Sequence, residues 1–288
     1  MLEGRLTSQS KGIPWRGPGP ERPDGLPLPP ARMPIVRGGR PLKRWTYVGV
    51  YDAGLMLCVG IVRIGVLGQA FWAVWDPGAG RLAERTRALR TGSVAVDARS
   101  ARVRDGGVAI DLIVDDGVPV EVVSPHGDEY VWTRKRGGVR ARGRVVVDGR
   151  ERAVEARALV DESAGYHARE TAWEWSAGVG TAADGRAVAW NLVTGIHDAL
   201  HASERTLWLD GAPHEVGPVR FAPALDAITG VDGETLRFAE QAERAREDDL
   251  LVLRSSYHQP FGRFTGVLPG GVELAEGSGV MERHRARW

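Results

Sequence analysis

Short runs of alternating hydrophobic and polar residues, separated by turn signals, fill most of the chain after residue 33. Asp-Gly, a dipeptide favoured in tight β-hairpin turns, occurs at 105–106, 116–117, 148–149, 184–185, 210–211 and 232–233. Valine- and aromatic-rich runs lie among these turns, at 108–114, 118–123, 130–134, 144–147, 187–193 and 250–256. Short strands at regular spacing favour barrels or sandwiches over βαβ units. The pattern therefore predicts an all-β fold of antiparallel strands, arranged as barrels or sandwiches.

Two segments have a helix-forming composition instead. Residues 81–90 read RLAERTRALR, and residues 239–247 read AEQAERARE. The composition of the first segment predicts a short helix on the rim of a barrel. The second lies between strand-like runs, and we interpret it as an exposed strand with the composition of a helix.

The first 33 residues differ from the rest of the chain. Nine of the 17 prolines fall within the first 41 residues. Lacking periodicity and many backbone donors, residues 1–33 should form no regular structure, and we expect a Pro-rich arm that is disordered or wraps over the surface. Trp15 in this arm is either a docking anchor or an exposed tail residue.

Tryptophan-containing strands recur in both halves of the remaining chain. The first half has FWAVWD, and the second has TAWEWSAG, AVAWNLVTG and LWLDG. This rough duplication and the usual size of domains predict two β-barrel domains, 34–160 and 161–288. The polar segment 159–165 is the expected linker.

Composition narrows the function classes. Of the 288 residues, 43% are hydrophobic and 26% are charged, which is typical of a soluble globular protein. The 38 basic and 37 acidic residues nearly cancel, so net charge gives no reason to expect nucleic acid or an anionic membrane as partner. The apolar stretch 53–62 is too short to cross a bilayer, and the N-terminus has no hydrophobic signal core. We therefore expect a cytoplasmic protein without integral membrane association, and the oligomeric state stays open.

Lysine and cysteine are rare in this chain, and neither points to a particular reaction. The lysines are Lys11, Lys43 and Lys135, and we attribute this bias toward arginine to GC-rich coding. The single cysteine, Cys58, excludes an internal disulfide and lies in an apolar run, where a thiol is usually an inert packing residue.

The densest candidate site is the segment YHARETAWEWSAG. If residues 166–176 form a strand, alternation places one set of side chains on a single face: His167, Arg169, Thr171, Trp173 and Trp175. Such a face suits a cavity wall, with indole rings lining an apolar pocket and ionisable groups at its mouth. Alternatively, the tryptophans only fill the core.

The C-terminal segment VMERHRARW supplies a second candidate face. Arginines at 283, 285 and 287 share one side and need solvent or an interface, which turns Glu282, His284 and Trp288 inward. A buried carboxylate and imidazole two residues apart can shift each other's pKa and form an acid/base pair. The alternative is a Glu–His hydrogen bond that only fixes the terminus.

Two further polar residues complete the candidate site. Arg263 shares a face with Phe261 and Thr265, and is expected to neutralise Glu282 or orient a polar ligand group. Asn191 is an interior-facing amide if its strand keeps Ala187 and Ala189 on the same side.

No metal or cofactor is expected. His197 and His201 have the i, i+4 spacing of helical zinc ligands, but they lie between strands and without the glutamate of an HExxH motif. Gly-rich phosphate loops and a Gly-x-Ser-x-Gly nucleophile motif are likewise missing from the sequence.

A series of segments resembles the bacterial family called domain of unknown function 2804. The segments are RWTYVGVYD, FWAVWD, GYHARETAWEWSAG, AWNLVTG, SERTLWLDG, QPFGRFTGVL and GVMERHRARW, which cover roughly residues 34–288. Arg205 departs from the pattern, in which asparagine is expected after the glutamate. The family is in turn distantly similar to double β-barrel carotenoid hydratases and lipocalin-type cyclases. The resemblance implies two lipocalin-like (calycin-type) antiparallel β-barrels with an apolar cavity, without fixing a reaction.

These observations suggest a binding protein or cofactor-independent enzyme for a hydrophobic small molecule, such as a polyene or isoprenoid. In an enzyme, Glu282 or His284 would protonate an alkene, leading to hydration, isomerisation or cyclisation. Trp173, Trp175 and Trp288 would stabilise the positive charge, while His167, Arg169 and Asn191 would orient a polar head. The alternatives are a non-catalytic carrier and a structural module whose Pro-rich arm binds a partner.

Overall fold

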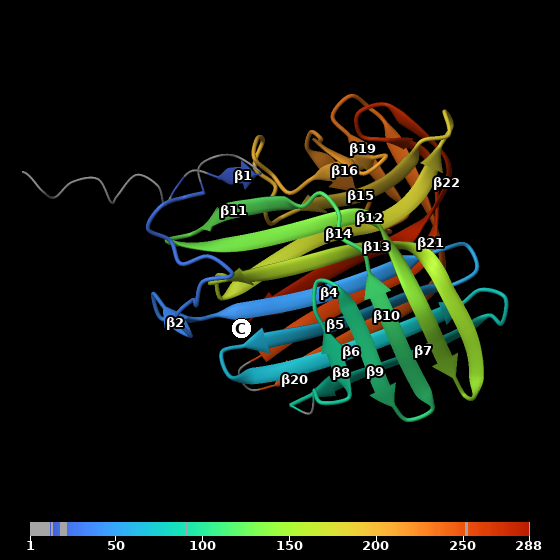
Figure 1. The fold of residues 1–288 in the computed structure, drawn as a ribbon. Helices are drawn as coiled ribbons and strands as arrows, with labels where there is room; N and C mark the ends of the chain where they lie inside the picture. Colours follow the sequence, from blue (N-terminus) through green and yellow to red (C-terminus); the bar gives the residue numbers. More distant parts are fainter. Residues whose placement is uncertain (1–11, 13, 18–21, 90, 251–252, 288) are drawn as a thin grey trace, which may run out of the picture.

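The computed structural model describes residues 12, 14–17, 22–89, 91–250 and 253–287, and every regular element in these ranges is a β-strand. The strands form two large antiparallel sheets and a two-stranded ribbon (Figure 1). The all-β prediction, with antiparallel barrel-like sheets, is confirmed.

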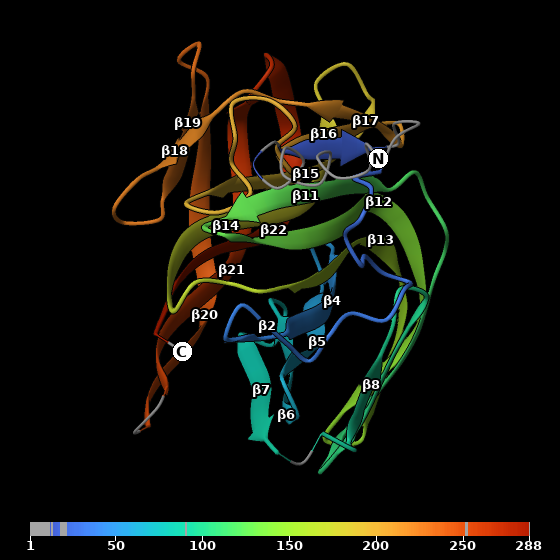
Figure 2. The same ribbon diagram turned by 90° about the vertical axis from the view of Figure 1, so that its left-hand side faces the viewer.

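The first sheet has eleven strands, which run in the order β7-β6-β5-β4-β13-β12-β10-β9-β8, with β11 beside β12 and β1 beside β11. Its members are β1 (Trp15–Gly17), β4 (Lys43–Tyr51), β5 (Met56–Ile64), β6 (Leu67–Asp76), β7 (Arg81–Ala88), β8 (Val94–Val96), β9 (Ser100–Asp105), β10 (Val108–Val114), β11 (Val120–His126), β12 (Glu129–Val147) and β13 (Arg150–Gly165). The ribbon consists of β2 (Val36–Arg37) and β3 (Arg40–Pro41). The sheet curls so that β8 packs across β4, β5 and β6 (Figure 2). The enclosed core is apolar and includes Val48, Leu57 and Ile110.

A buried carboxylate closes the gap between the two edges of this curled sheet. Asp105, at the end of β9, accepts hydrogen bonds from Trp72 Nε1 at 3.0 Å, Arg85 Nη1 at 3.0 Å and Arg87 Nε at 2.9 Å. The bonds from Arg87, Trp72 and Arg85 hold the pKa of the Asp105 carboxyl well below its usual range. Side chains thus join β6 and β7 to β9, which the backbone ladder leaves unpaired.

The second sheet has nine strands in the order β17-β16-β15-β14-β22-β21-β20-β19-β18. Its members are β14 (Glu170–Ala182), β15 (Ala187–Thr194), β16 (Thr206–Leu209), β17 (Ala212–Glu215), β18 (Val219–Phe221), β19 (Ala227–Gly230), β20 (Thr235–Leu250), β21 (Leu253–Leu268) and β22 (Val272–Arg287). It curls around its own apolar core, which includes Trp190, Phe264 and Met281.

The outer faces of the two curled sheets pack against each other and form a third core, which we call the inter-sheet layer. Alternation along β4 shows how it arises: Tyr47 and Tyr51 point into this layer, while Val48 and Val50 point into the first core. From the second sheet, β14, β15, β21 and β22 contribute the opposite wall, including Trp175 and other buried apolar side chains. The layer holds most of the candidate site.

The Asp-Gly dipeptides are mostly hairpin turns, as expected. Five of the six join consecutive strands that pair with each other, whereas 116–117 lies between β10 and β11, which each pair with β12. At Asp148–Gly149 and Asp210–Gly211 both residues have positive φ, the conformation of a type I′ turn.

The predicted helix at 81–90 is wrong. Residues 81–88 form β7, an edge strand that pairs with β6. Backbone pairing overrides the weak helix propensity, and charged side chains are common on edge strands because they discourage further pairing. Residues 239–247 belong to β20, which confirms the interpretation of that segment as a strand.

Two strand boundaries also differ from expectation. The runs 130–134 and 144–147 are parts of one long strand, β12, which has a bulge between Gly137 and Val139. The run 250–256 is interrupted, because β20 ends at Leu250 and β21 begins at Leu253.

The expected domain boundary at 160/161 falls inside β13, which pairs along its length within the first sheet. Division into two domains stays a prediction.

Part of the Pro-rich arm has regular structure, contrary to expectation. Its residues 1–11, 13 and 18–21 lie outside the described ranges, but Trp15–Gly17 form β1, which pairs with β11. Trp15 packs against a small apolar cluster that includes Leu28, Tyr130 and Trp132. This short stretch holds no proline, so its backbone groups can pair with an available sheet edge.

Candidate functional site

Glu282 of β22 is a buried carboxyl group in the inter-sheet layer. Trp173 Nε1 donates to its Oε1 at 2.8 Å, and Gln259 Nε2 donates to its Oε2 at 2.9 Å. The Tyr257 hydroxyl also hydrogen-bonds the carboxyl group. Burial raises the pKa of Glu282, although these donors partly oppose the shift. Glu282 therefore retains a proton to higher pH than an exposed glutamate.

A buried guanidinium organises the groups behind Glu282. Arg244 Nη1 donates to Gln259 Oε1 at 3.2 Å and to the Tyr257 hydroxyl at 3.3 Å. Its Nε donates to Glu84 of the first sheet at 2.9 Å, which ties β20 to β7 across the layer. Arg244 thereby fixes the orientation of two of the groups that bind Glu282.

Cys58 of β5 borders the same network. Its Sγ lies 3.7 Å from Gln259 Oε1 and 3.8 Å from Arg244 Nη1. Burial raises the pKa of the Cys58 thiol, which agrees with its interpretation as an unreactive packing residue.

His284 lies on the same face of β22, against the edge of an indole ring. Its ring centroid is 4.3 Å from that of Trp173, and its Nε2 is 2.8 Å from Ser255 Oγ. Burial, followed by the nearby Lys43, lowers the pKa of His284 to about 4. At neutral pH this imidazole is uncharged, so it can accept a proton.

A second polar group lies deeper in the layer, around Lys135 of β12. Lys135 Nζ is 2.7 Å from Asp161 Oδ1 and 3.5 Å from Glu204 Oε1, and all three residues are buried. Burial alone would lower the pKa of Lys135, but Asp161 and Glu204 raise it overall. The ammonium also lies 6.0 Å from the centre of the Trp175 ring.

Asn191 connects Glu204, a neighbour of Lys135, to the indole ring of Trp175. Its Oδ1 accepts a 2.8 Å hydrogen bond from Trp175 Nε1, and its Nδ2 donates to the Glu204 carbonyl at 2.9 Å. Asn191 is fully buried, as expected for an interior amide. Both of its polar groups are used, so it positions Trp175.

Buried imidazoles and hydroxyls extend the site toward the segment 195–204. The ring centroid of His167 lies 5.0 Å from that of Trp45 and 6.5 Å from that of His197. Burial lowers the pKa of both histidines well below the usual range, so both are neutral at pH 7. Neither ring nitrogen of His197 has a hydrogen-bond partner among the described residues, nor do the hydroxyls of Thr133 and Ser163. These polar atoms are available to a polar group of a ligand.

Five of the residues singled out in the sequence lie together in the structure. All five lie in the inter-sheet layer: Trp173, Trp175, Asn191, Glu282 and His284. Trp173 contacts both Glu282 and His284. Trp175 contacts Asn191 and lies opposite Glu282 in the strand register. His167 is buried as well, but it lies before β14 begins, next to Trp45. Their proposed roles in binding and catalysis remain predictions.

Three other predicted residues lie elsewhere or cannot be placed. Arg169 is exposed, because the strand begins only at Glu170 and the alternation assumed for 166–169 does not hold. Arg263 pairs in register with Ser278, four residues before Glu282, and borders a surface cleft of about 440 Å³ together with Tyr51 and Asp52. The guanidinium beside the Glu282 network is that of Arg244. Trp288 lies outside the described residues.

Several site residues were missed, and the sequence held a signal for some of them. Lysine is rare in this chain, and both Lys43 and Lys135 are buried. The rarity of lysine among so many arginines was therefore a signal that could have marked these two residues as site candidates. Tyr257 and Gln259 lie two residues apart in β21, so the period-two alternation used for the predicted faces places them on one side of the strand. Arg244 was hidden by the helix-like composition of its segment.

The departure at Arg205 has a structural explanation. Its buried guanidinium donates to the carbonyls of Asp198 at 2.8 Å and Ala199 at 2.6 Å. Nε also donates to the Val216 carbonyl at 3.3 Å. Arg205 therefore fixes the loop that leads to Glu204, the partner of Lys135.

The site offers no cluster typical of a metal centre. Among the described residues, no group of three or more His, Cys, Asp or Glu side chains could hold a metal ion. His197 is buried whereas His201 is exposed, so the two do not share a face. Nor do the described ranges include a helix long and apolar enough to span a membrane.

Comparison with solved structures finds similar chains at very low sequence identity. An AttH-like protein from Nitrosomonas europaea is 13% identical, with a TM-score of 0.55 over 89% of this chain and 97% of that one. Kievitone hydratase from Nectria haematococca is 8% identical, with a TM-score of 0.49 over 85% of this chain and 88% of that one. A search of curated proteins finds no match.

The family model described as "Domain of unknown function (DUF2804)" matches residues 91–288, more than half of the chain. This range includes β14, β21 and β22, which carry Trp173, Gln259 and Glu282. The chain is a member of the DUF2804 family.

Proposed function

We propose that the inter-sheet layer around Glu282 binds a small lipophilic molecule and that Glu282 transfers a proton to it. The observation that carries this proposal is the buried Glu282 carboxyl group, which has a raised pKa and lies among aromatic side chains. Such a group keeps its proton to higher pH than an exposed glutamate, and it can act as a general acid without a cofactor. The reaction would be hydration, isomerisation or cyclisation of a polyene- or isoprenoid-like alkene.

The first step moves the Glu282 proton to one alkene carbon and leaves a carbocation at the other. Trp173, Trp175 and Tyr47 belong to this part of the layer, and the faces of their rings would stabilise the cation. In hydration, water then adds to the cation and loses a proton, which restores Glu282. In isomerisation or cyclisation the cation loses a carbon-bound proton to neutral His284. Proton exchange with solvent then returns a proton to Glu282 and removes one from His284, which restores both groups.

A polar head group has a place beside this aromatic wall. His167, His197, Thr133 and Ser163 offer uncharged donors and acceptors, and Lys43 adds an amine whose pKa burial lowers to about 7. Stacking of Trp45 on Trp173, with centroids 6.4 Å apart, makes the two parts continuous. An amphipathic molecule would therefore lie with its head near His167 and its alkene near Glu282.

Deuterium incorporation tests the proton transfer whatever product the reaction forms. The protein is incubated in D₂O with isoprenoid alkenes, and each alkene is analysed by mass spectrometry. We expect the wild type to add deuterium to carbon and Glu282→Gln to lose about 100-fold or more of this rate. Glu174→Gln, on the opposite face of β14, is the control and should retain it.

A non-catalytic carrier is the main alternative, and one observation favours it. Trp173, Gln259 and Tyr257 already bind the Glu282 carboxyl group, as expected for a carboxylate that only stabilises the layer. A carrier would bind an apolar compound, detectable by mass spectrometry of protein purified from its native host, and add no deuterium to it. A packed structural core would bind neither such a compound nor a hydrophobic dye.

A further inference from the structure

Exposed hydrophobic side chains gather at one end of the first sheet. Of the nine large hydrophobic side chains that are exposed in the described ranges, five belong to this end: Ile35, Val36, Val66, Leu67 and Leu89. Val66, in the β5–β6 turn, is 85% exposed, and Leu89, just after β7, is 71% exposed. Isolated exposed apolar residues are ordinary, but a group of them marks an interaction surface.

Backbone hydrogen bonds show that these five residues form one patch, which we call the apolar tip. The Leu89 amide donates to the Gly68 carbonyl at 2.7 Å, next to Leu67. On the other side, the Gly65 amide donates to the Leu42 carbonyl at 2.8 Å, and the Leu42 amide donates to Ile35 at 2.7 Å. The β5–β6 turn therefore lies between Leu89 and the Ile35–Val36 segment.

Arginines flank the apolar tip. Arg44 of β4 and Arg63 of β5 are exposed and lie directly opposite each other in the strand register. Like charges at such positions are unfavourable. Neither arginine has an ion-pair or hydrogen-bond partner among the described residues, and the same holds for the exposed Arg32. Elsewhere on the sheet, exposed arginines such as Arg104 and Arg140 pair with carboxylates.

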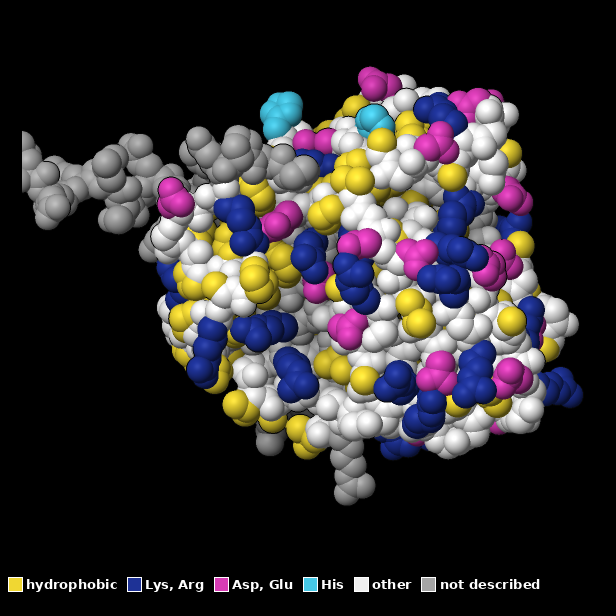
Figure 3. Space-filling model, viewed as in Figure 1, with side chains coloured by type: hydrophobic (Ala, Val, Ile, Leu, Met, Phe, Trp, Pro, Cys, Tyr) yellow, Lys and Arg dark blue, Asp and Glu magenta, His cyan; other side chains and the backbone are white. Residues whose placement is uncertain are grey.

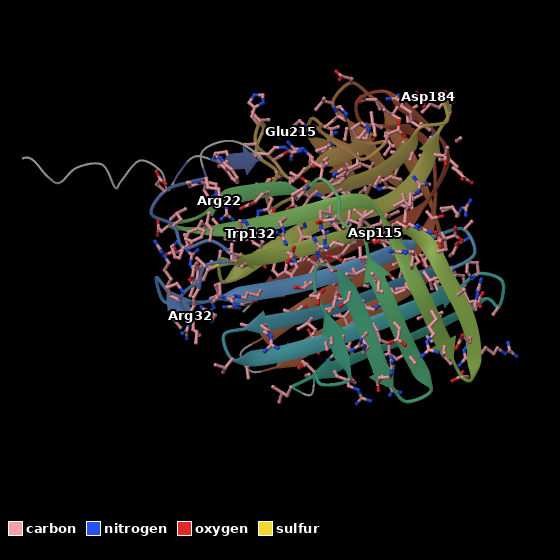
Figure 4. All side chains as sticks on the ribbon, in the orientation of Figure 1. Arg22, Arg32, Asp115, Trp132, Asp184 and Glu215 are labelled. Atoms are coloured by element: carbon pink, nitrogen blue, oxygen red, sulfur yellow. The ribbon has the colours of Figure 1, made fainter. Side chains whose placement is uncertain are left out.

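The figures show the same arrangement. In Figure 3 the lower left edge of the molecule, over β2 and the β5–β6 turn, carries hydrophobic and basic side chains side by side. Figure 4 places Arg32 at this end, next to β2. The protein thus combines protruding aliphatic residues with uncompensated positive charge, although its net charge is only +1.

We propose that the apolar tip and its arginines dock the protein on an anionic lipid bilayer. Aliphatic side chains at turn tips insert into the interfacial region, and basic residues are attracted by anionic head groups. Unpaired Arg44 and Arg63 are complementary to such a surface. The tip lies near the start of β4, where Lys43 adjoins the candidate site, so a docked protein presents this end of the inter-sheet layer to the lipid.

Vesicle co-sedimentation tests this proposal. The full chain is mixed with phosphatidylcholine vesicles that either contain or lack phosphatidylglycerol. We expect binding only to the anionic vesicles and release at high salt. Val66→Asp/Leu67→Asp and Arg44→Gln/Arg63→Gln should each weaken binding about tenfold or more.

Matched controls separate docking from a general loss of charge or hydrophobicity. Ile113→Asp/Leu200→Asp removes two exposed hydrophobic residues outside the tip. Arg150→Gln/Arg220→Gln removes two exposed arginines that form no ion pair within the described part of the chain. Both controls should bind like the wild type, and all variants should unfold at unchanged urea concentrations. Failure of the wild type to bind anionic vesicles, or equal loss in the controls, overturns the proposal. So does binding of the tip to a protein without binding to lipid. The experiment measures vesicle binding and not turnover, so its result is independent of the role of Glu282.

Discussion

The indole Nε1 of Trp173 donates a 2.8 Å hydrogen bond to Oε1 of Glu282, diagonally across the paired strands β14 and β22. In this register Trp173 lies opposite His284, whose ring it contacts edge-on. One indole thus binds the buried carboxyl group and packs against the neighbouring imidazole.

Trp173→Phe should raise the pKa of Glu282 further. The indole hydrogen bond favours the ionised carboxylate, and phenylalanine removes that donor while keeping an aromatic ring. NMR titration of carbon-13-labelled glutamate measures the change. An unchanged Glu282 titration would show that the hydrogen bond contributes little to its protonation.

Glu282→Gln should gain stability relative to the wild type as pH rises. Because the folded-state pKa of Glu282 is raised, its stabilising contribution is complete below the ordinary pKa of 4.5 and is lost as pH rises through the folded-state pKa. Glutamine cannot ionise and shows no such loss. Urea unfolding at pH 5 and pH 8 gives the comparison, and a constant difference between the two proteins would contradict it.

His284→Gln should make the protein less sensitive to acid. The pKa of His284 is lowered from 6.5 to about 4, so its contribution is complete above pH 6.5 and is lost as pH falls through about 4. At about 1.4 kcal/mol per pKa unit, this loss is on the order of 3 kcal/mol. Urea unfolding between pH 7 and pH 4 measures it, with exposed His201→Gln as the control that should behave like the wild type.

Lys135→Met should destabilise the protein by about 3–5 kcal/mol, because Asp161 and Glu204 would be left buried without their counter-ion. Arg134→Met, at the next residue, breaks a more exposed ion pair with Glu162 and should cost about 1 kcal/mol or less. Chemical denaturation of both variants measures the two losses in the free energy of unfolding. Equal losses would mean that burial of the Lys135 group is not what makes it important.

Asp105→Asn should lower the free energy of unfolding by about 2 kcal/mol, because the charge-assisted hydrogen bonds from Arg85 and Arg87 are weakened. Asp111→Asn, which alters a more exposed arginine cluster on β10, should cost less. Hydrogen exchange of β7 and β9 locates the effect. Faster exchange confined to other strands would argue against closure by Asp105.

Local pattern determined much of this fold. Period-two alternation and Asp-Gly turns predicted the strands, and alternation along β14 and β22 correctly turned Trp173, Trp175, Glu282 and His284 to one side. It could do so because the side on which a residue lies depends only on its position within its own strand. The same rule failed for Arg169, which precedes the strand, and for segment 81–90, where pairing with β6 overrode helix propensity.

Only the tertiary structure decided what lies opposite those faces. Cys58 and Gln259 are 201 residues apart in sequence yet are in contact, and Arg244 reaches Glu84 from the other sheet. Lys135 likewise meets Asp161 and Glu204 only once β12, β13 and the loop before β16 are assembled. Alternation fixes the side of a sheet but not its partner, because the packing of two sheets depends on all their side chains together. The sequence therefore determined the strands and one wall of the site, and the packing of the two sheets determined its charge network.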